Sequence, residues 1–415
     1  MAELKPIVHI DALMEELETL AHISEADPPV VTRIVFSHAD LRARVHVKEL
    51  CREAGLTVRE DAIGNTFIRW EGQDSNLAPV ATGSHIDAIP NAGAYDGVVG
   101  VLGGLEAIRS LQRAGYQPLR PIELIIFTAE EPTRFGIGCL GSRVMGGVLT
   151  PEQACALHDK HGHSLDELRT AAGFFGELDS VLLAPGCFHA FVELHIEQGV
   201  LLEREGLEIG VVTHIAAPAS LKVEITGEGG HAGAMLMPDR RDALCAASEL
   251  ILALESAAKS TGAIDSVATV GICDVFPGAV NSVPSKVRLE TDIRDTDPAR
   301  RDAVIGKLKS AAEEISVRRG VDIRFQTVNA DPPAACDPMI LEAIQSAVTD
   351  SGLGGRPMVS RAYHDSLFVA RFAPVAMIFI PCHDGISHRP DEYASPEWIA
   401  GGVEVLARTL AKLAG

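Results

Sequence analysis

The stretch PVATGSHIDAIPNAGAYDGVVGVLGGLEAIRSLQRAGYQPLRPIELIIFT, residues 79–128, decides the fold. It holds two mainly apolar segments, 79–82 and 122–128, which are typical of strands buried on both faces of a parallel sheet. Between them, apolar residues recur at helical spacing over 98–111 and predict a helix that faces the core. Three glycines in that helix weaken its propensity, so we interpret them as points of close backbone packing. The stretch therefore predicts strand, helix and strand.

Outward from this stretch, the chain changes style twice. Short apolar runs alternate with helical patterns over residues 1–213 and again over 331–415, where 375–381 (VAMIFIP) is another buried strand. Residues 214–330 instead follow the order strand, helix, strand, strand, helix, strand, which is typical of a ferredoxin-like unit. We therefore predict an α/β mixed-sheet domain formed by 1–213 and 331–415, with an α+β domain inserted at 214–330.

Composition excludes several classes of function. The chain has 415 residues, with 36 Lys and Arg against 57 Asp and Glu, for a net charge of −21. Such an acidic surface repels phosphate backbones and anionic membranes, so we expect no nucleic-acid partner and no membrane partner. No apolar run approaches the ~20 residues that span a bilayer. The N-terminal segment lacks a secretory apolar core and the eight cysteines form no C-x-x-C pair, so we expect free thiols in the cytoplasm.

Potential metal ligands follow the ends of the predicted strands. They are His85, Asp96, the adjacent pair Glu130 and Glu131, His195 and His388. In open α/β sheets, sites form outside the carboxyl ends of the strands, so these side chains are expected to meet at one edge. Imidazole and carboxylate together suit Zn or Mn, and a carboxylate shared by two divalent ions is the arrangement of a two-metal hydrolase.

The two adjacent glutamates need different roles, because neighbouring extended residues point to opposite sides. One can hold a metal while the other takes a proton from water. Asp87 is placed to orient the His85 imidazole. Each residue also has a simpler interpretation: an Asp before Gly is usually a turn residue, and a single His at a strand end is usually hydrogen-bonded within the protein.

Several segments together resemble a known family. They are GSHIDAIPNAGAYDGVVGVLGGLEAI, TAEEPTRFGIGCLGSR, FVELHIEQG, GEGGHAGAMLMPDRRDA, AVNSVPSKVRLETDIRD and GISHRPDEY. In this order, over nearly the whole chain, they resemble the M20-type metallopeptidases and, more specifically, their hydantoinase/carbamoylase amidase branch. The resemblance implies a two-domain fold whose inserted domain mediates dimerisation.

The resemblance also implies a dinuclear centre with two divalent ions, Mn or Zn. One ion would be held by His85, Asp96 and His195, and the other by Asp96, Glu131 and His388. The glutamate before the ligand glutamate, here Glu130, would be the general base.

Substrate residues are implied in the same way. The branch cleaves a ureido C–N bond beside a carboxylate, and its substrate-binding positions match Gln198, His231, Asn281 and Arg294. His231 would stabilise the oxyanion of the reaction, and Arg294 would pair with the substrate carboxylate through its planar fork. In the family the His, Asn and Arg come from the inserted domain and reach a neighbouring subunit's metal site, which implies a homodimer with active sites completed in trans. The alternatives are that His231 braces its own loop and that Arg294 pairs with a neighbouring aspartate.

One departure narrows the substrate. Allantoate- and carbamoyl-amino-acid-cleaving members commonly carry a Gln-Arg-Arg-like segment where this chain has Ala-Pro-Ala-Ser, residues 217–220. IAAPAS, EEPTRFGIGCLGSR and RAYHDSLFVAR, the last with Tyr363 and His364, instead resemble the members that act on ureidoglycolate. The expected reaction converts (S)-ureidoglycolate and water to glyoxylate, ammonia and CO2.

Other functions remain open at this point. They are N-carbamoyl-L-amino acid hydrolysis, allantoate hydrolysis, an M20 aminopeptidase activity, and a metal-free binding or scaffold protein on the same fold. Loss of any of the five metal ligands would favour the last, yet all five residues are present.

Overall fold

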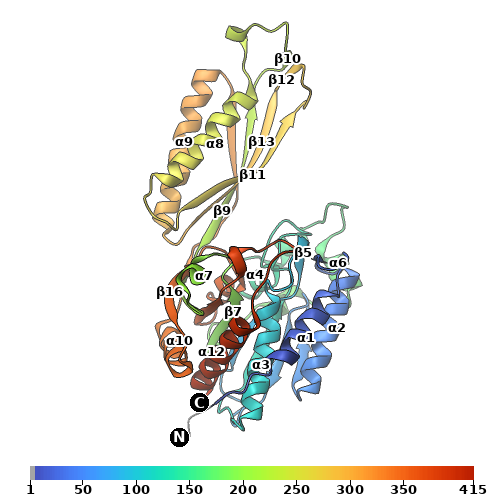
Figure 1. Ribbon diagram of the computed structural model, residues 1–415. Helices are drawn as coiled ribbons and strands as arrows, with labels where there is room; N and C mark the ends of the chain where they lie inside the picture. The colour runs from blue at the N-terminus through green and yellow to red at the C-terminus, as the bar shows by residue number, and fades with distance from the viewer. Residues whose placement is uncertain (1–4) are drawn as a thin grey trace. The chain divides into compact units, whose positions relative to one another are not determined.

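The computed structural model describes residues 5–415, and the chain divides into two compact units (Figure 1). The first comprises the chain up to Thr213 together with Ala335–Met358 and His364–Gly415. The second comprises His214–Ala334 and Val359–Tyr363. The short return segment joins the second unit because the Ala216 amide donates to the Ser360 carbonyl at 2.8 Å, a pairing that the sequence pattern did not predict.

The first unit is built on a mixed sheet. Its strands are β2 (Thr57–Glu60), β3 (Thr66–Trp70), β4 (Val80–His85), β6 (Ile122–Phe127), β7 (Ala190–Ile196), β8 (Ile209–Ile215), β15 (Ala334–Ala335), β16 (Gly355–Ser360) and β17 (Val375–Ile380). The order is β15-β8-β17-β7-β4-β6-β3-β2, with β16 paired to β8. The four strands from β17 to β6 run parallel. Strands β8 and β3 pair antiparallel with β17 and β6, and β2 pairs antiparallel with β3. The predicted mixed α/β sheet is confirmed.

Helices pack on this sheet. They are α1 (Ile10–Ala21), α2 (His38–Glu53), α3 (Val98–Arg113), α4 (Leu140–Met145), α5 (Pro151–Cys155), α6 (Leu165–Ala171), α7 (Leu201–Glu205), α10 (Pro338–Ser351), α11 (Asp365–Val369) and α12 (Pro396–Ala414). Short 3-10 turns are η1 (Leu178–Val181) and η3 (His383–Gly385), and β1 (Val31–Arg33) pairs separately with β5 (Ala88–Ala92). Figure 1 shows α1, α3 and α12 together, and all three contact one another.

The glycines of α3 allow the close packing that the sequence suggested. A Cβ at Gly100 would lie 2.4 Å from the Leu194 carbonyl oxygen, and one at Gly104 would lie 2.9 Å from a Leu124 methyl group. Helix α3 therefore lies directly against β6 and β7. Aromatic side chains of the same strands, including Phe127 and Phe191, belong to a separate buried cluster that includes residues of α4.

The second unit has its own sheet and core. Strands β9 (Ala217–Thr226), β11 (Val267–Phe276), β13 (Lys286–Asp295) and β14 (Asp322–Ala330) form an antiparallel sheet in the order β11-β13-β9-β14. Helices α8 (Ala243–Lys259) and α9 (Pro298–Arg319) contact this sheet, and a two-stranded pair, β10 (Gly230–His231) and β12 (Ser282–Val283), and a 3-10 turn, η2 (Met237–Asp239), complete the unit. The main strands and helices follow the predicted β-α-β-β-α-β order.

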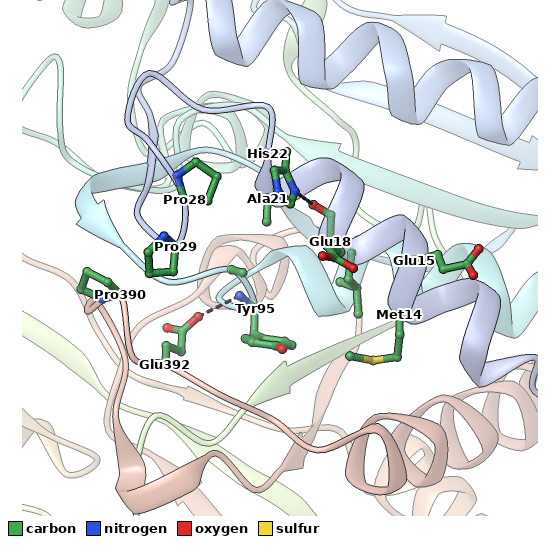
Figure 2. A pocket seen from close by; sticks show the side chains of 12 residues that line it. Met14, Glu15, Glu18, Ala21, His22, Pro28, Pro29, Tyr95, Pro390 and Glu392 are labelled. Carbon is green, nitrogen blue, oxygen red and sulfur yellow. Dashed lines mark hydrogen bonds between the residues drawn. The ribbon is translucent and has the colours of Figure 1, made fainter.

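A pocket of about 600 Å³ opens in the first unit (Figure 2). Its walls come from α1, the Pro28–Pro29 turn, the loop before α3 and the loop after β17. Tyr95 and Glu392 form the part of the wall nearest the chain segments that carry Asp96 and His388. Within residues 5–415, no helix combines the length and apolarity needed to cross a bilayer.

Candidate active site

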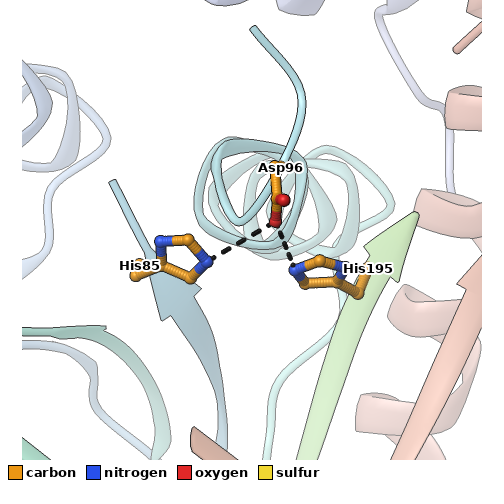
Figure 3. Close-up of side chains that lie close together, drawn as sticks. All are labelled: His85, Asp96 and His195. Atoms are coloured by element: carbon orange, nitrogen blue, oxygen red, sulfur yellow. Dashed lines mark ion pairs between the residues drawn. The ribbon is translucent and has the colours of Figure 1, made fainter. Parts of the chain in front are cut away.

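The ends of the parallel strands bring two histidines and one aspartate together (Figure 3). His85 is the last residue of β4 and His195 lies near the end of β7, so both project from the same edge of the sheet. Asp96 lies just before α3, with an Oδ1 3.1 Å from His195 Nε2 and 3.7 Å from His85 Nε2. All three are buried. Their ligand atoms lie within 4.8 Å of one another, a spacing that one cation can bridge.

Main-chain carbonyls fix the orientation of both imidazoles. His85 Nδ1 lies 3.0 Å from the Asp87 carbonyl oxygen, and His195 Nδ1 lies 2.9 Å from that of Ile196. Each Nδ1 therefore donates to a carbonyl, so that Nε2, which is directed at Asp96, is the nitrogen available to a metal ion. With Nε2 unprotonated, each imidazole has the tautomer that a metal ligand requires.

The second oxygen of Asp96 faces another group of ligands. His388 Nε2 lies 3.1 Å from Asp96 Oδ2 and 3.3 Å from Glu131 Oε1, and these three residues form a second cluster within 4.8 Å. The His388 side chain is 46% exposed, so this side of the site is open to solvent. Asp96 thus directs one oxygen to each cluster, as a carboxylate shared by two ions would.

The backbone after β6 separates Glu130 from Glu131. Ala129 has a left-handed φ of 55°, which turns the following amides toward Asp87. The Asp87 carboxylate accepts from Glu130 N at 3.2 Å and from Glu131 N at 3.1 Å. Glu130 Oε2 then lies 3.7 Å from His85 Nε2, whereas Glu131 reaches His388. The two glutamates therefore face different clusters.

Asp87 contacts His85 as predicted, through its main chain. The Asp87 carbonyl oxygen lies 3.0 Å from His85 Nδ1, whereas the carboxylate Oδ1 lies 3.7 Å away. The carboxylate instead fixes the two glutamate amides. The carboxylate binds these main-chain donors because the turn at Ala129 directs two N–H groups toward it.

Burial and neighbouring charged groups shift the pKa values of several residues in the site. Burial would raise the pKa of Asp96, but its contacts with His195, His388 and His85 hold it well below its usual value. Burial, reinforced by the negative charge of Glu131, raises the pKa of Glu130 well above its usual value although His85 acts in the opposite direction. Contacts with Asp96 and then Glu131 raise the pKa of His388 to about 11. Buried carboxylates gathered around imidazole nitrogens make a donor set that suits divalent cations.

Gln198 and His364 also lie beside this centre. Gln198, at a left-handed φ of 54°, donates from Nε2 to Asp96 Oδ2 at 2.7 Å. The His364 ring is buried, with its centroid 4.4 Å from that of His195. Both were predicted to bind substrate, and the structure places both against the candidate metal ligands.

Comparison with known proteins places the chain in a family. The model of peptidase family M20/M25/M40 matches residues 81–412. The chain belongs to the M20/M25/M40 peptidase family. The similarity continues at high identity with individual members: a ureidoglycolate hydrolase of Arabidopsis thaliana is 53% identical, over 98% of this chain and 87% of the relative.

Two further similarities define the branch of this M20 member. An N-carbamoyl-L-amino acid amidohydrolase of Geobacillus stearothermophilus is 38% identical, over 97% of this chain and 98% of the relative. A crystal structure described as AtUAH in complex with glyoxylate is 52% identical, with a TM-score of 0.91, over 100% of this chain and 99% of that one. The resemblance that the sequence motifs indicated is therefore confirmed.

The remaining predicted substrate residues of the M20 member belong to its second unit. His231 is exposed, and its Nδ1 accepts from Gly233 N at 3.1 Å. Asn281 is exposed, and its carbonyl accepts from Ala232 N at 2.9 Å, so it lies beside the His231 loop. Arg294 donates to both oxygens of Asp292, at 2.7 and 3.0 Å. The local roles considered as alternatives for His231 and Arg294 are thus both seen within this unit.

Tyr363 lies in the same unit as Arg294. The Arg294 guanidinium carbon is 5.6 Å from the centre of the Tyr363 ring, and its Nη1 donates to the Arg361 carbonyl at 3.3 Å. The segment around Tyr363 therefore supports the arginine fork from a second side.

Sequence reasoning missed two buried acids around the M20 site. Glu193, two residues before His195, accepts from Ser84 Oγ at 2.8 Å and from Ser366 Oγ at 2.5 Å. Glu392, four residues after His388, accepts main-chain and hydroxyl donors from two loops. Their proximity in sequence to predicted ligands was the available signal, because a charged residue beside a buried ligand needs its own partners.

Proposed function

We propose that this protein is a metal-dependent amidohydrolase that cleaves the ureido C–N bond of (S)-ureidoglycolate. The observation that carries the proposal is Asp96, whose two oxygens face two separate sets of imidazole and carboxylate ligands. The 53% identity to a ureidoglycolate hydrolase supports the choice of substrate. The Ala-Pro-Ala-Ser segment, which lies in β9, has no arginine to bind a second carboxylate or ureido group, which supports a substrate with a single ureido group.

The ligand sets fit two divalent ions, Mn²⁺ or Zn²⁺. His85, Asp96 and His195 would hold one, and Asp96, Glu131 and His388 the other. When bound, such ions supply Lewis acidity toward the ureido carbonyl and lower the pKa of water. The first unit would thus be the catalytic domain.

Glu130 is the proposed general base. Its carboxylate is buried beside His85 and is not part of either ligand set, so it is available for proton transfer. Its raised pKa means that it can hold a proton taken from the attacking water and deliver it to the departing nitrogen. The Cys139 thiol, which donates to Glu130 Oε1 at 3.4 Å, limits the rotation of the carboxylate.

The second unit would act as dimerisation and lid domain. Arg294 would bind the substrate carboxylate, Asn281 would hold the carboxylate or ureido group, and His231 would donate to the oxyanion, each in the site of a neighbouring subunit. Exchange of Asp292 for a substrate carboxylate at Arg294 would keep the bidentate geometry already present. The substrate would also be positioned by Gln198 and His364, which contact Asp96 and His195. Tyr363, which contacts Arg294, would help to hold the substrate carboxylate.

An exposed strand edge supports the homodimer. Strand β11 is the terminal strand of its sheet, and it exposes Val267, Ile272 and Phe276 by 39%, 43% and 46%. An open edge with apolar side chains is a template for pairing with another chain.

All eight cysteines are free, which is consistent with the reducing conditions of the cytoplasm.

Product stoichiometry tests the substrate assignment. One ureidoglycolate and one water should give one glyoxylate, one CO2 and two ammonia, because the hydroxyglycine left after C–N cleavage loses its amine spontaneously. The protein, loaded separately with Mn²⁺ and Zn²⁺, is incubated with (S)-ureidoglycolate, allantoate, N-carbamoyl-L-amino acids and a dipeptide. Ammonia and glyoxylate in a ratio of two to one, without urea, are expected from ureidoglycolate. Activity confined to another substrate would contradict the proposal.

N-carbamoyl-L-amino acid hydrolysis is the second candidate. The 38% identity to such an amidohydrolase over nearly the whole chain favours it over the peptidase activity. In that case N-carbamoyl substrates would release one ammonia, one CO2 and a free amino acid, and ureidoglycolate would release little ammonia.

A further inference from the structure

Glu392 connects the two loops that carry Asp96 and His388. It lies in the loop between β17 and α12 and is 5% exposed. Its Oε1 accepts from Tyr95 N at 2.8 Å, shown in Figure 2, and from Asp96 N at 3.0 Å. Its Oε2 accepts from Ser387 Oγ at 2.9 Å and from His388 N at 3.3 Å. One carboxylate therefore holds four donors from segments almost 300 residues apart in the sequence.

These bonds reach the candidate ligands themselves. Two of the four donors are the main-chain amides of Asp96 and His388. The Ser387 hydroxyl oxygen lies 2.9 Å from both Glu392 Oε2 and Asp96 Oδ2, so it connects the Glu392 carboxylate to the shared ligand. His388 has a left-handed φ of 59°, a conformation that persists in a non-glycine residue only where its surroundings hold it.

Hydrogen bonds, and not packing alone, hold Glu392 in place. The pocket of about 600 Å³ borders Glu392 together with Tyr95 and Pro390, so one side of this loop lies against open space. On another side, the chain at Gly93 comes so close that an added Cβ would lie 2.3 Å from Glu392 Cβ. Packing therefore confines Glu392 on the Gly93 side only, and the four hydrogen bonds fix the position of its carboxylate.

We propose that Glu392 is a positioning residue that sets the distance between Asp96 and His388 and thereby the affinity of the cation position formed by Asp96, Glu131 and His388. This inference rests on the dinuclear centre of the proposed function. The position formed by His85, Asp96 and His195 depends less on Glu392, because both of those imidazoles are oriented by carbonyls of their own strand segments.

The variant Glu392→Gln tests this with little change in volume. Its amide oxygen can still accept from Tyr95 and Asp96, but its amide nitrogen cannot accept from His388 N. Metal-stripped protein is titrated with MnCl2 by calorimetry. The wild type should bind two ions, and the variant should bind one with unchanged affinity and the other about 10- to 100-fold more weakly. Saturating Mn²⁺ should restore most of kcat, with KM for ureidoglycolate unchanged.

A matched control is Glu397→Gln, an exposed glutamate five residues further on, at the start of α12. It should bind both ions as the wild type does. Ser387→Ala, which removes the hydroxyl between Glu392 and Asp96, should weaken the same cation position and serves if Glu392→Gln does not fold. A lower melting temperature with an unchanged Mn²⁺ isotherm in Glu392→Gln would overturn the positioning role. A wild type that binds fewer than two ions would instead refute the dinuclear centre, and the inference with it.

Discussion

At the scale of single residues, Glu130 and Glu131 differ in their surroundings. Both are buried and adjacent, yet only Glu131 lies in a ligand cluster, and Glu130 faces His85 from outside it. The pair is held apart by Asp87, which binds both amides. Replacing the Glu130 carboxylate should therefore have a different effect from replacing the Glu131 carboxylate.

Glu130→Gln should keep the metals and lose turnover. The amide has nearly the same shape but cannot accept a proton, so we expect kcat to fall by about 10²- to 10⁴-fold. Elemental analysis of the purified variant should still find the wild-type metal content, and ammonia release gives the rate. Glu131→Gln is the comparison and should lose metal. Metal loss in Glu130→Gln would mean that Glu130 is itself a ligand.

At the scale of elements, the start of α3 is fitted to the site. Gly97 precedes the helix with a left-handed φ of 67°, and a Cβ there would lie 2.4 Å from the His85 imidazole. The same helix packs its glycines on β6 and β7, which fixes the position of Asp96 relative to both histidines. The start of the helix thus positions the candidate ligand Asp96, and Gly97 leaves room for the imidazole of His85.

Gly97→Ala should displace His85 and weaken metal binding. Gly115→Ala is a matched control, because Gly115 has a φ of 69° with nothing within 4 Å of an added Cβ. Both variants should lose about 1 kcal/mol or more of stability from backbone strain. Only Gly97→Ala should also lose Mn²⁺ affinity, measured by titration of metal-stripped protein. Equal Mn²⁺ affinity in the two variants would show that His85 tolerates the methyl group.

At the scale of the whole molecule, the question is whether one subunit completes the site of another. The proposed base lies in the first unit and the proposed carboxylate clamp in the second. A dimer that exchanges these contributions can therefore be assembled from two different inactive chains.

Mixing Glu130→Gln with Arg294→Ala should restore activity. After dissociation and reassociation, a hybrid dimer has one site with Glu130 from one chain and Arg294 from the other. Ammonia release from ureidoglycolate should then rise toward about one half of the wild-type rate per hybrid, since one of two sites is intact. Each variant reassociated alone is the control. No recovery, with hybrids verified by differential tagging, would mean that both residues act within one chain.

Apolar runs and helical spacing predicted the buried strands and long helices, because burial in the core dictates residue type along the whole element. For example, the helix predicted at 98–111 is observed at Val98–Arg113. Short elements such as β2, β5 and α7 were missed, since segments of four or five residues are too short to carry a periodic signal.

The sequence by itself determined the family, and the types and order of the candidate ligands, because motifs at strand ends are local patterns. Only the tertiary structure decided which oxygen of Asp96 faces which histidine, that Asp87 holds amides, and that Glu392 connects two loops. These are contacts between segments far apart in sequence. They depend on how the strands pair and where each loop turns. A shift of a few ångströms, or a single left-handed residue, changes which donor lies within hydrogen-bond distance of a carboxylate.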